Sequence, residues 1–294
     1  MEKRFQLQFI NEVPGQLLRQ AIAAWGISKR ALTAIKFDGG ALYVNGEEKN
    51  VRHPLAVGDA VTIVFPLEQV SDGLVPQQAP LEIIYEDDAL LVINKPAFMS
   101  SIPSREHPDG SLANFICGYF ETKQLASTVH IVTRLDRDTS GLMVIAKHRH
   151  IHHLMSEQQQ AGLVHREYEA VVEGIVAVDT KSIIAPIGRK DTSIIEREVR
   201  EDGQFAHTDV TVLARKAQKT HVRLKLHTGR THQIRVHMSY VGHPLVGDEL
   251  YGGDRAQLGR QALHCRYVAF IHPLTKQPVQ FECALPQDIV DVLK

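Results

Sequence analysis

The sequence predicts an α+β protein in which a small N-terminal α/β domain precedes a larger domain with a mixed, largely antiparallel sheet and flanking helices. Two observations support this class. Short apolar runs with strand-like alternation recur along the second part of the chain, whereas long helical patterns are few. Residues 66–80 combine three prolines with several polar side chains, which is typical of a linker. We therefore predict domains at 1–66 and 81–294, joined by a linker at 67–80.

The first domain begins with two helical patterns. Residues 13–26 carry apolar side chains at helical spacing, and Ser28 is a suitable N-cap for a second helix that extends through Ile35. A strand and a turn are expected at 41–46, and a last pair of strands within 51–65, around a Gly-Asp turn.

This order of elements, with its Val-Asn-Gly and Val-Gly-Asp turns, resembles the S-four-like RNA-binding domain, named after a small-subunit ribosomal protein. In that domain, basic residues of the second helix and of the following turn contact phosphates. The resemblance implies RNA contacts for four basic residues here, Lys29, Arg30, Lys36 and Arg52. The alternative is a small folded appendage without a role in RNA binding.

The second domain starts with two strands, 81–85 and 89–93, on either side of an acidic turn. A helix is expected after Ser111, and another between Thr231, a suitable N-cap, and Gly242, a helix stop. The remaining expected elements are a helix at 150–160 and strands at 142–146, 164–173, 208–214, 220–227, 263–271 and 279–285.

Composition and cysteine usage restrict the class of protein. The 294 residues are 44% hydrophobic and 23% charged, as in ordinary soluble proteins, and no apolar run is long enough for a membrane span. The N-terminus lacks the core of a signal peptide, and the three cysteines form neither a CxxC pair nor an even disulfide framework. We therefore expect a cytoplasmic protein without membrane contact, and we take it to be a monomer.

The distribution of charge favours a nucleic-acid partner at one place. The net charge of −1 argues against a protein that coats nucleic acid over its whole surface. Between Val210 and Gly247, however, there is no Asp or Glu, while this stretch holds seven Lys or Arg and five histidines. A basic stretch on a neutral protein indicates a localised phosphate-binding track.

The segment Arg-Leu-Asp-Arg-Asp-Thr-Ser-Gly, residues 134–141, lies between two apolar runs. Its Asp136 is framed by Arg134 and Arg137 and followed by turn residues. A carboxylate between strand-like runs needs a partner cation, because an unpaired buried charge is costly. Such a pair suits a nucleophile or an acid–base group, and the alternative is an Arg–Asp turn that closes a hairpin.

Two further segments add to this signal. Within residues 226–252, a turn precedes the predicted helix, and Arg235 lies in its first turns, where it can point toward a carboxylate beyond the helix start. Residues 165–174 alternate like a strand, and Tyr168 shares a face with Arg166.

Together these segments resemble the RluA-type pseudouridine synthases. Residues 134–136 and 139–141 match the family pattern around its essential acid, although Thr133 stands where many members carry His. The early, middle and late family motifs are matched by Asn-Lys-Pro at 94–96, Tyr-x-Ala-x-Val-x-Gly at 168–174 and Gly-Arg-Thr-His-Gln-Ile-Arg at 229–235. Four motifs in the family order are far more specific than one.

The resemblance implies the pseudouridine synthase fold and the isomerisation of uridine in RNA, in which the base detaches from its ribose, turns and reattaches through carbon-5. It implies that Asp136 is the essential carboxylate and that Arg235 supplies the opposite charge. Asp136 then attacks the anomeric carbon or the uracil ring, or assists departure of the base, and the sequence does not choose among these routes. Tyr168 is expected to stack on the uracil and to offer its hydroxyl for proton transfer.

RNA contacts within the large domain are implied for Arg134, Lys95 and Arg230. The target uridine must leave its stack, at a cost of a few kcal/mol. Arg134 matches a family residue that can fill the space left by the base, and its alternative role is a plain ion pair. Lys95 is expected to have a structural or RNA-contact role without taking part in catalysis.

No cofactor and no metal are expected. The isomerisation has no net gain or loss of atoms or electrons, and the sequence has no GxGxxG after a strand, no phosphate-binding loop and no zinc spacing. The cluster His148, His150, His152 and His153 is expected along a solvated helix rather than at a metal.

Two other functions compete with this interpretation. One is a binding protein that keeps the fold without catalysis. The other is a glycoside hydrolase or nucleosidase with paired carboxylates, for which Asp138 is the obvious second acid. The N-terminal domain favours a large structured RNA as the partner, with large-subunit ribosomal RNA ahead of transfer RNA.

Overall fold

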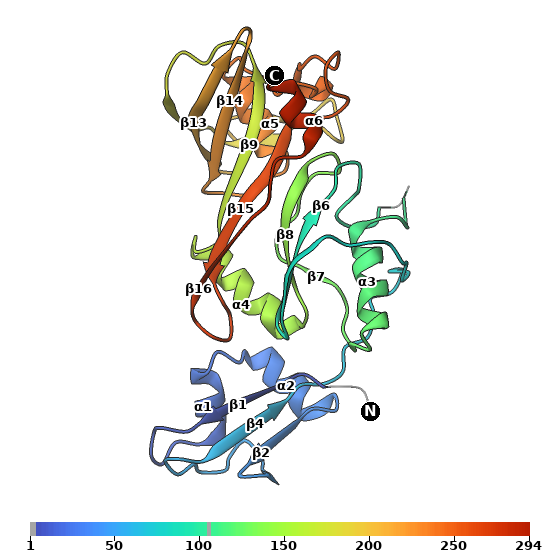
Figure 1. Ribbon diagram of the computed structural model, residues 1–294. Helices are drawn as coiled ribbons and strands as arrows, with labels where there is room; N and C mark the ends of the chain where they lie inside the picture. Colours follow the sequence, from blue (N-terminus) through green and yellow to red (C-terminus); the bar gives the residue numbers. More distant parts are fainter. Residues whose placement is uncertain (1–3, 105–106) are drawn as a thin grey trace.

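The computed structural model describes residues 4–104 and 107–294, so residues 1–3 of the predicted first domain lie outside the described part. Figure 1 shows a small α/β unit and a longer unit built on a large sheet. In the small unit, antiparallel strands follow the order β1-β4-β2-β3. Its elements are β1 Gln6–Ile10, α1 Leu18–Ala24, α2 Lys29–Phe37, β2 Ala41–Val44, β3 Glu47–Glu48 and β4 Ala60–Val64.

The core of the small unit forms between its helices and its sheet. Val61 and Ile63 alternate with more exposed neighbours along β4, and both pack with Ile35 of α2. The predicted N-cap of α2 is confirmed, because the Ser28 side chain accepts a hydrogen bond from Ala31 N–H (3.1 Å). Burial of these apolar side chains gives the unit a hydrophobic core of its own.

Two details predicted for this unit are wrong. Helix α1 begins at Leu18 rather than at residue 13, because the loop 51–55 lies across its start. Backbone carbonyl oxygens of this loop accept hydrogen bonds from the N–H groups of Leu18 and Arg19. That loop is therefore not a strand, and β4 alone remains of the pair expected within 51–65. The strand β1 was not predicted, although Phe5, Leu7 and Phe9 alternate with glutamines in the sequence and pack against the core of this unit.

The larger unit contains a ten-stranded sheet in the described residues. Eight strands follow the order β10-β13-β14-β9-β15-β8-β6-β5, with β16 beside β15 and β7 beside β8. All of these pairs are antiparallel except β8 with β15, so the predicted mixed, largely antiparallel sheet is confirmed. The strands are β5 Ile83–Glu86, β6 Leu90–Lys95, β7 His130–Ile131, β8 Ser140–Ala146, β9 His165–Glu173, β10 Thr180–Ile184, β13 His207–Lys216, β14 Lys219–Leu226, β15 Leu263–Ile271 and β16 Pro278–Glu282.

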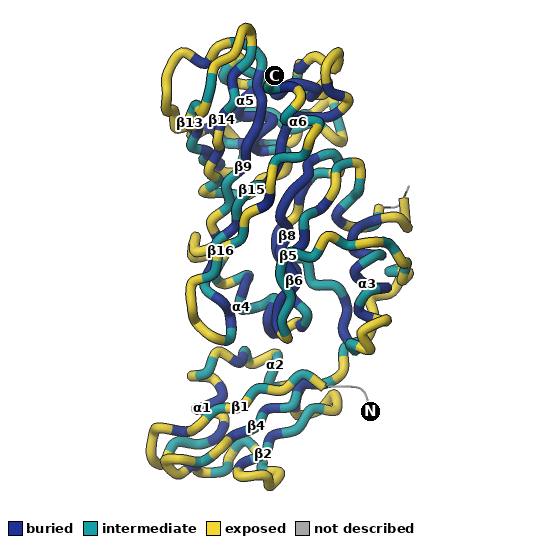
Figure 2. Tube along the Cα trace, viewed as in Figure 1, coloured by how far each residue is buried: buried dark blue, intermediate teal, exposed yellow. Residues whose placement is uncertain are grey.

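The parallel contact of β8 with β15 is the seam between the two halves of this sheet. At the seam, Gly141 lies opposite Cys265 with a φ of 119°, and a β-carbon at Gly141 would lie 2.3 Å from the Cys265 carbonyl oxygen. Only glycine permits this approach of the two backbones. Figure 2 shows that β6, β8 and β9 around the seam are largely buried. The loop that carries Asp136 leads directly into β8 at this point.

Helices and a short ribbon complete the larger unit. The helix expected after Ser111 is confirmed, with Ser111 as its N-cap. The helix of the late motif begins one residue later than predicted, with His232 rather than Thr231 at the N-cap position. Across residues 4–104 and 107–294, no helix has the length and apolar character needed to cross a membrane. These elements are α3 Leu112–Thr122, α4 Arg149–Gln160, the ribbon β11 Ile187–Arg189 with β12 Arg197–Val199, α5 Gln233–Tyr240, the 3-10 helix η1 Glu249–Tyr251 and α6 Gln287–Val292.

The segment 66–80 has no helix or strand and lies against the larger unit. The Glu68 carboxylate is 2.5 Å from His130 Nε2 and accepts a hydrogen bond from Arg149 N–H (2.6 Å). Further along, Gln77 N–H donates to the carbonyl oxygen of Asn114 (3.0 Å). These contacts anchor the segment that the composition predicts as a linker.

The histidine cluster differs from the expectation of a solvated helix. His148 and His150, at the start of α4, are buried, and their rings stack on Phe5 (centroids 4.0 Å apart) and Phe65 (5.1 Å) of the small unit. Burial lowers the pKa of each histidine to about 4, so both are neutral at pH 7. The start of α4 therefore contacts the small unit, whereas the sequence predicted that these histidines face solvent.

Candidate active site

Asp136 lies in the loop between β7 and β8, and hydrogen bonds to the backbone hold this loop. The Ser101 hydroxyl donates to the Leu135 carbonyl oxygen (2.6 Å), and Thr139 N–H donates to the carbonyl oxygen of Asp136 itself (3.1 Å). The Asp136 side chain remains 28% exposed. The carboxylate is therefore fixed in position and still accessible from outside.

Of the two roles expected for Lys95, a structural role and a contact with RNA, the structure supports the structural one. Lys95 is fully buried, so the expected contact with RNA is wrong. Its Nζ donates to the carbonyl oxygens of Pro96 (2.8 Å), Met99 (2.8 Å) and Arg137 (3.0 Å), and the last bond ties it to the Asp136 loop. Burial lowers the pKa of Lys95 to about 7, although the aspartates of the loop partly oppose this shift. Lys95 thus acts as a structural tether beneath the site.

Arg235 connects two carboxylates. Its Nη1 donates to Asp136 Oδ2 at 3.3 Å, which is the predicted contact. Its Nε and Nη2 donate to the two oxygens of Asp248 at 2.7 and 2.8 Å, in a two-pronged arrangement. Burial alone would lower the pKa of Arg235, but the hydrogen bonds to these carboxylates raise it above its ordinary value. Asp248 is therefore the main partner of Arg235, and Asp136 is the second.

A closely packed loop places Asp248 beneath the guanidinium. The Asp248 side chain is only 1% exposed. Val246, two residues earlier, donates its N–H to the carbonyl oxygen of Val171 in β9 (2.9 Å) and accepts a hydrogen bond from Ala262 N–H (2.8 Å). Gly247 has a φ of 80°, and a β-carbon there would lie 1.9 Å from the Arg260 carbonyl oxygen. The loop therefore has little freedom to move the carboxylate away from Arg235.

His232 and Tyr251 extend this network. The His232 backbone has a φ of 56°, which is uncommon for residues other than glycine. The Tyr251 hydroxyl accepts a hydrogen bond from Arg197 N–H (2.9 Å) and lies 2.8 Å from His232 Nδ1, while His232 Nε2 lies 3.9 Å from Asp136 Oδ2. Burial lowers the pKa of His232. If the Tyr251 hydroxyl donates a hydrogen bond to Nδ1 of a neutral His232, the imidazole carries its hydrogen on Nε2, which faces Asp136.

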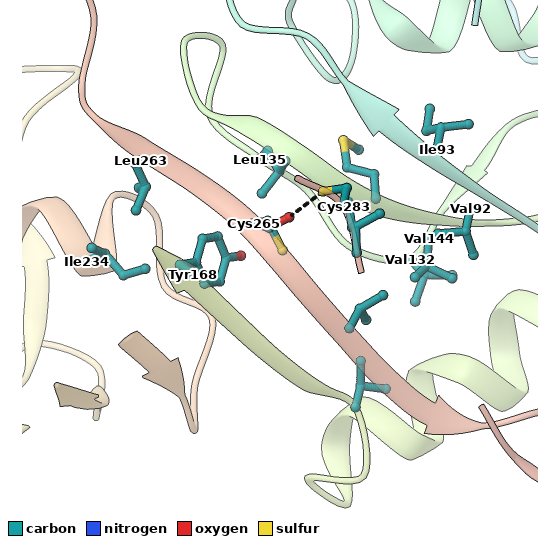
Figure 3. Close-up of a cluster of buried hydrophobic side chains, with 14 of the residues drawn as sticks. Val92, Ile93, Val132, Leu135, Val144, Tyr168, Ile234, Leu263, Cys265 and Cys283 are labelled. Carbon is teal, nitrogen blue, oxygen red and sulfur yellow. Dashed lines mark hydrogen bonds between the residues drawn. The ribbon is translucent and has the colours of Figure 1, made fainter. Parts of the chain in front are cut away.

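Tyr168 on β9 is buried, so most of its ring is covered by other side chains. Its side chain packs in the core between Ile234, Leu263 and Cys265, with the hydroxyl directed toward Cys265 (Figure 3). It is 4% exposed, and burial raises the pKa of its hydroxyl. The phenol therefore stays protonated at neutral pH. Its ring forms part of the wall of the recess beside Asp136.

Two connected spaces meet at Asp136. A cleft of about 750 Å³ runs between the Asp136 loop, the start of β9 and residues 225–231. A recess of about 70 Å³ lies between Asp136, Tyr168 and Arg235. The exposed Arg134 lines both spaces.

Two further arginines line the cleft and the recess. Arg230 is exposed and donates to the Phe205 carbonyl oxygen (2.9 Å) and to Gln204 Oε1 (3.0 Å). Arg166 has a buried Nε without a hydrogen-bond partner and packs on Gly229, where a β-carbon would lie 2.8 Å from its Nη2. A side chain at Gly229 would therefore require the end of the Arg166 side chain to shift.

The remaining predicted residues lie elsewhere. Asp138, the rival acid, lines neither the cleft nor the recess, and its Oδ1 is buried without a hydrogen-bond partner. The four basic residues assigned to the small unit, Lys29, Arg30, Lys36 and Arg52, are all exposed. They are on a different unit from Asp136, so they do not form part of the cleft.

Sequence reasoning missed Asp248, His232, Tyr251 and Arg166. One signal was available, since the segment Gly-Asp-Glu-Leu-Tyr-Gly at 247–252 concentrates an acid, a tyrosine and two glycines shortly after the late motif. Nothing local indicates that this segment folds back onto Arg235. His232 lies within the late motif, but its unusual backbone is visible only in the structure.

Comparisons with known proteins identify the family of this chain. A family model described as RNA pseudouridylate synthase matches residues 89–240. The uncharacterized RNA pseudouridine synthase YjbO of Bacillus subtilis is 55% identical over 92% of this chain and 95% of its own length. Ribosomal large subunit pseudouridine synthase D of Pseudomonas aeruginosa is 38% identical over 96% of this chain and 92% of its own length. Among solved structures, human RNA pseudouridylate synthase domain containing 1 has a TM-score of 0.59 and 26% identity, covering 70% of this chain and 83% of that one.

Proposed function

This chain belongs to the RNA pseudouridylate synthase family, and from that premise we propose that it isomerises specific uridines of large-subunit ribosomal RNA, with Asp136 as its essential carboxylate. The reaction replaces the bond between the ribose and the base nitrogen N1 with a bond to carbon-5. Atoms and electrons balance within the nucleotide, because carbon-5 loses a proton when it bonds to the ribose and N1 gains a proton in place of its bond to the ribose. The proposal therefore includes no cofactor and no metal in the chemistry.

The position of Asp136 carries the proposal. Its carboxylate lies where the large cleft meets the small recess, with the Arg235 guanidinium 3.3 Å away. An RNA strand in the cleft would thus present an unstacked base directly to an anionic oxygen. Attack on the ribose, attack on the ring and assistance to the leaving base all require a carboxylate at this point.

The neighbouring side chains have distinct roles in this proposal. Arg235 orients the Asp136 carboxylate through its Nη1, while Asp248 holds Arg235. Tyr168 supplies a rigid ring in the wall of the recess, against which the base packs. His232 adds a second polar group beside the carboxylate, with its Nε2 3.9 Å from Asp136 Oδ2.

RNA binding involves the cleft and the small unit. Arg134 and Arg230 line the cleft and contact the RNA there, and Arg134 occupies the space that the flipped base leaves. The small unit, residues 1–66, binds phosphates through the exposed Lys29 and Arg30 of α2, together with Lys36 and Arg52. A relative named for the large ribosomal subunit and an added RNA-binding domain both favour ribosomal over transfer RNA. We further propose that the protein acts as a cytoplasmic monomer.

The competing chemistry is a nucleosidase with two carboxylates. Such an enzyme places both acids on either side of the bond that it breaks. Asp138 lines neither the cleft nor the recess, whereas Asp136 lines both. This difference favours a single essential acid.

The test compares Asp136→Asn with the matched variant Asp138→Asn. Purified protein is incubated with ribosomal RNA that carries tritium at carbon-5 of uridine, because tritium is released when the base reattaches through that carbon. We expect release by the wild type and by Asp138→Asn, and none by Asp136→Asn, with RNA binding intact in all three. Mapping of pseudouridine in cellular RNA with and without the protein identifies the target. Normal turnover by Asp136→Asn, or free uracil as the product, would contradict the proposal.

A further inference from the structure

A second cluster of reactive side chains lies beyond the Asp136 site, on three adjacent strands. His207 begins β13, and His227 lies beside it just after β14, where His227 N–H donates to the His207 carbonyl oxygen (3.2 Å). Asp209 is two residues along β13 and therefore points to the same face as His207. Ser182 on β10 pairs directly with Asp209 and donates its hydroxyl hydrogen to the carboxylate.

The donor atoms of this cluster converge. His207 Nε2 is 3.1 Å from Asp209 Oδ1, and His227 Nε2 is 2.6 Å from Asp209 Oδ2. The two imidazole rings stack with their centroids 4.1 Å apart and an interplanar angle of 13°. One ligand atom from each of the three residues lies within 4.8 Å of the others. The face thus holds two nitrogen donors and one oxygen donor at a single point.

We propose that His207, Asp209 and His227 bind one divalent transition metal ion of the zinc class. Zinc ligands lie about 2.0–2.2 Å from the metal, so the donors of a tetrahedral site are about 3.4 Å apart. Small rotations of the side chains bring the present cluster to that spacing. Water completes the coordination, since the three side chains are between 22% and 38% exposed.

The chemistry of the donors selects the kind of metal. Two imidazoles with one carboxylate suit zinc, cobalt, nickel and copper, whereas magnesium and calcium prefer sites made of oxygen alone. The Asp209 carboxylate accepts the hydroxyl hydrogen of Ser182. Ser182 also orients the carboxylate from outside the ligand set.

The location connects this cluster to the cleft. His227 lines the cleft, and His207 N–H donates to Thr228 Oγ1 (3.0 Å). Gln233 Nε2, at the start of α5, donates to the His207 carbonyl oxygen (3.0 Å). A metal at this point would fix the beginning of the 227–233 loop and add positive charge beside the path of the RNA. No step of the isomerisation passes through it, so the site is separate from the Asp136 chemistry.

The test is direct metal binding to the untagged full-length protein, without RNA. Zinc is titrated in competition with a chromophoric chelator, and cobalt is used as a spectroscopic probe because its absorption reports the geometry of the ligands. We expect one zinc ion per chain, a cobalt spectrum of four- or five-coordinate metal, and no competition from magnesium or calcium. Thermal unfolding with and without zinc should show a higher Tm for the loaded protein.

Three variants and one control decide between this site and incidental binding. His207→Ala, His227→Ala and Asp209→Asn should each weaken zinc binding at least tenfold and remove the rise in Tm, while the exposed His107→Ala should change neither. Circular dichroism establishes that each variant is folded, and three variants at separate positions keep the test valid if one fails to fold. Absence of saturable 1:1 binding, or equal affinity in the wild type and the folded variants, would overturn the proposal.

Discussion

The buried Arg235–Asp248 pair leads to a prediction in which stability and catalysis respond to different residues. Replacing Asp248 by Asn removes a carboxylate that accepts two hydrogen bonds from Arg235 at 2.7 and 2.8 Å. The guanidinium, whose side chain is 9% exposed, then keeps the 3.3 Å contact with Asp136 as its one ion pair, together with the Tyr251 ring 4.9 Å away and the neutral oxygen of the new Asn. Removal of one partner of a buried ion pair costs about 3–5 kcal/mol. Each hydrogen bond to a charged group is worth about 1.5–3 kcal/mol, and two of them give a similar figure.

The matched change at Asp136 has the opposite profile. Asp136→Asn removes a single longer contact from a side chain that is 28% exposed, so its cost should be below about 1 kcal/mol. For a domain of this size, 1 kcal/mol corresponds to about 2–4 °C in Tm. We therefore expect Tm to fall by about 6–20 °C in Asp248→Asn and by less than about 4 °C in Asp136→Asn. Activity should be lost completely in Asp136→Asn and only partly in Asp248→Asn.

The measurements are thermal unfolding by circular dichroism and tritium release from uridine-labelled RNA, performed on the same preparations. The exposed Asp109→Asn serves as a control for the loss of one negative charge. An Asp248→Asn protein that melts within 2 °C of the wild type would refute the reasoning, because Arg235 would then be held by something other than Asp248.

Three further predictions follow from other parts of the structure. Lys95→Met should destabilise the protein, because it removes three hydrogen bonds. The Lys95 pKa of about 7 lies below its ordinary value, so the folded state binds fewer protons than the unfolded state between pH 7 and 10, and the contribution of Lys95 to stability rises with pH in that range. Denaturant titrations at several pH values should show this slope in the wild type and not in the variant. Docking of the small unit on His148 and His150 should weaken as the pH falls from 6.5 to 4, because the two histidines become protonated in this range only when they are undocked. Faster proteolysis of segment 66–80 at low pH would support this, and an unchanged rate would contradict it. Replacing Lys29 and Arg30 by Gln in the full chain should lower RNA affinity and reduce the salt slope by about 0.7–0.9 per lost phosphate contact, and equal slopes would mean that the small unit does not bind RNA.

The sequence predicts the site best where its residues lie within short contiguous motifs. The segments around Asp136 and Arg235 are 99 residues apart, yet the pattern of each led to a predicted contact that the structure contains at 3.3 Å. The main strands were also predictable, because buried apolar runs such as β6 and β8 leave a clear pattern.

Other features depend on tertiary packing and leave no local pattern. Asp248 becomes the chief partner of Arg235 only because the loop after α5 packs against β9 and turns back. The sequence left a structural role and an RNA contact both open for Lys95, because nothing local shows that three carbonyl groups converge on its Nζ. The strand β10 is mostly exposed, so no alternation of apolar residues marks it.

The seam between β8 and β15 has a consequence for how the chain acquires its structure. Ser140 and His264, which are hydrogen-bonded across the seam, are 124 residues apart, so the ribosome must synthesise nearly the whole chain before the two strands can meet. Contacts of such long sequence separation form slowly, because a large loop must close before any of them adds stability. The small unit, by contrast, is complete once β4 has emerged and can fold while the rest is being translated. A nascent chain would therefore hold a finished RNA-binding candidate well before it holds a catalytic cleft.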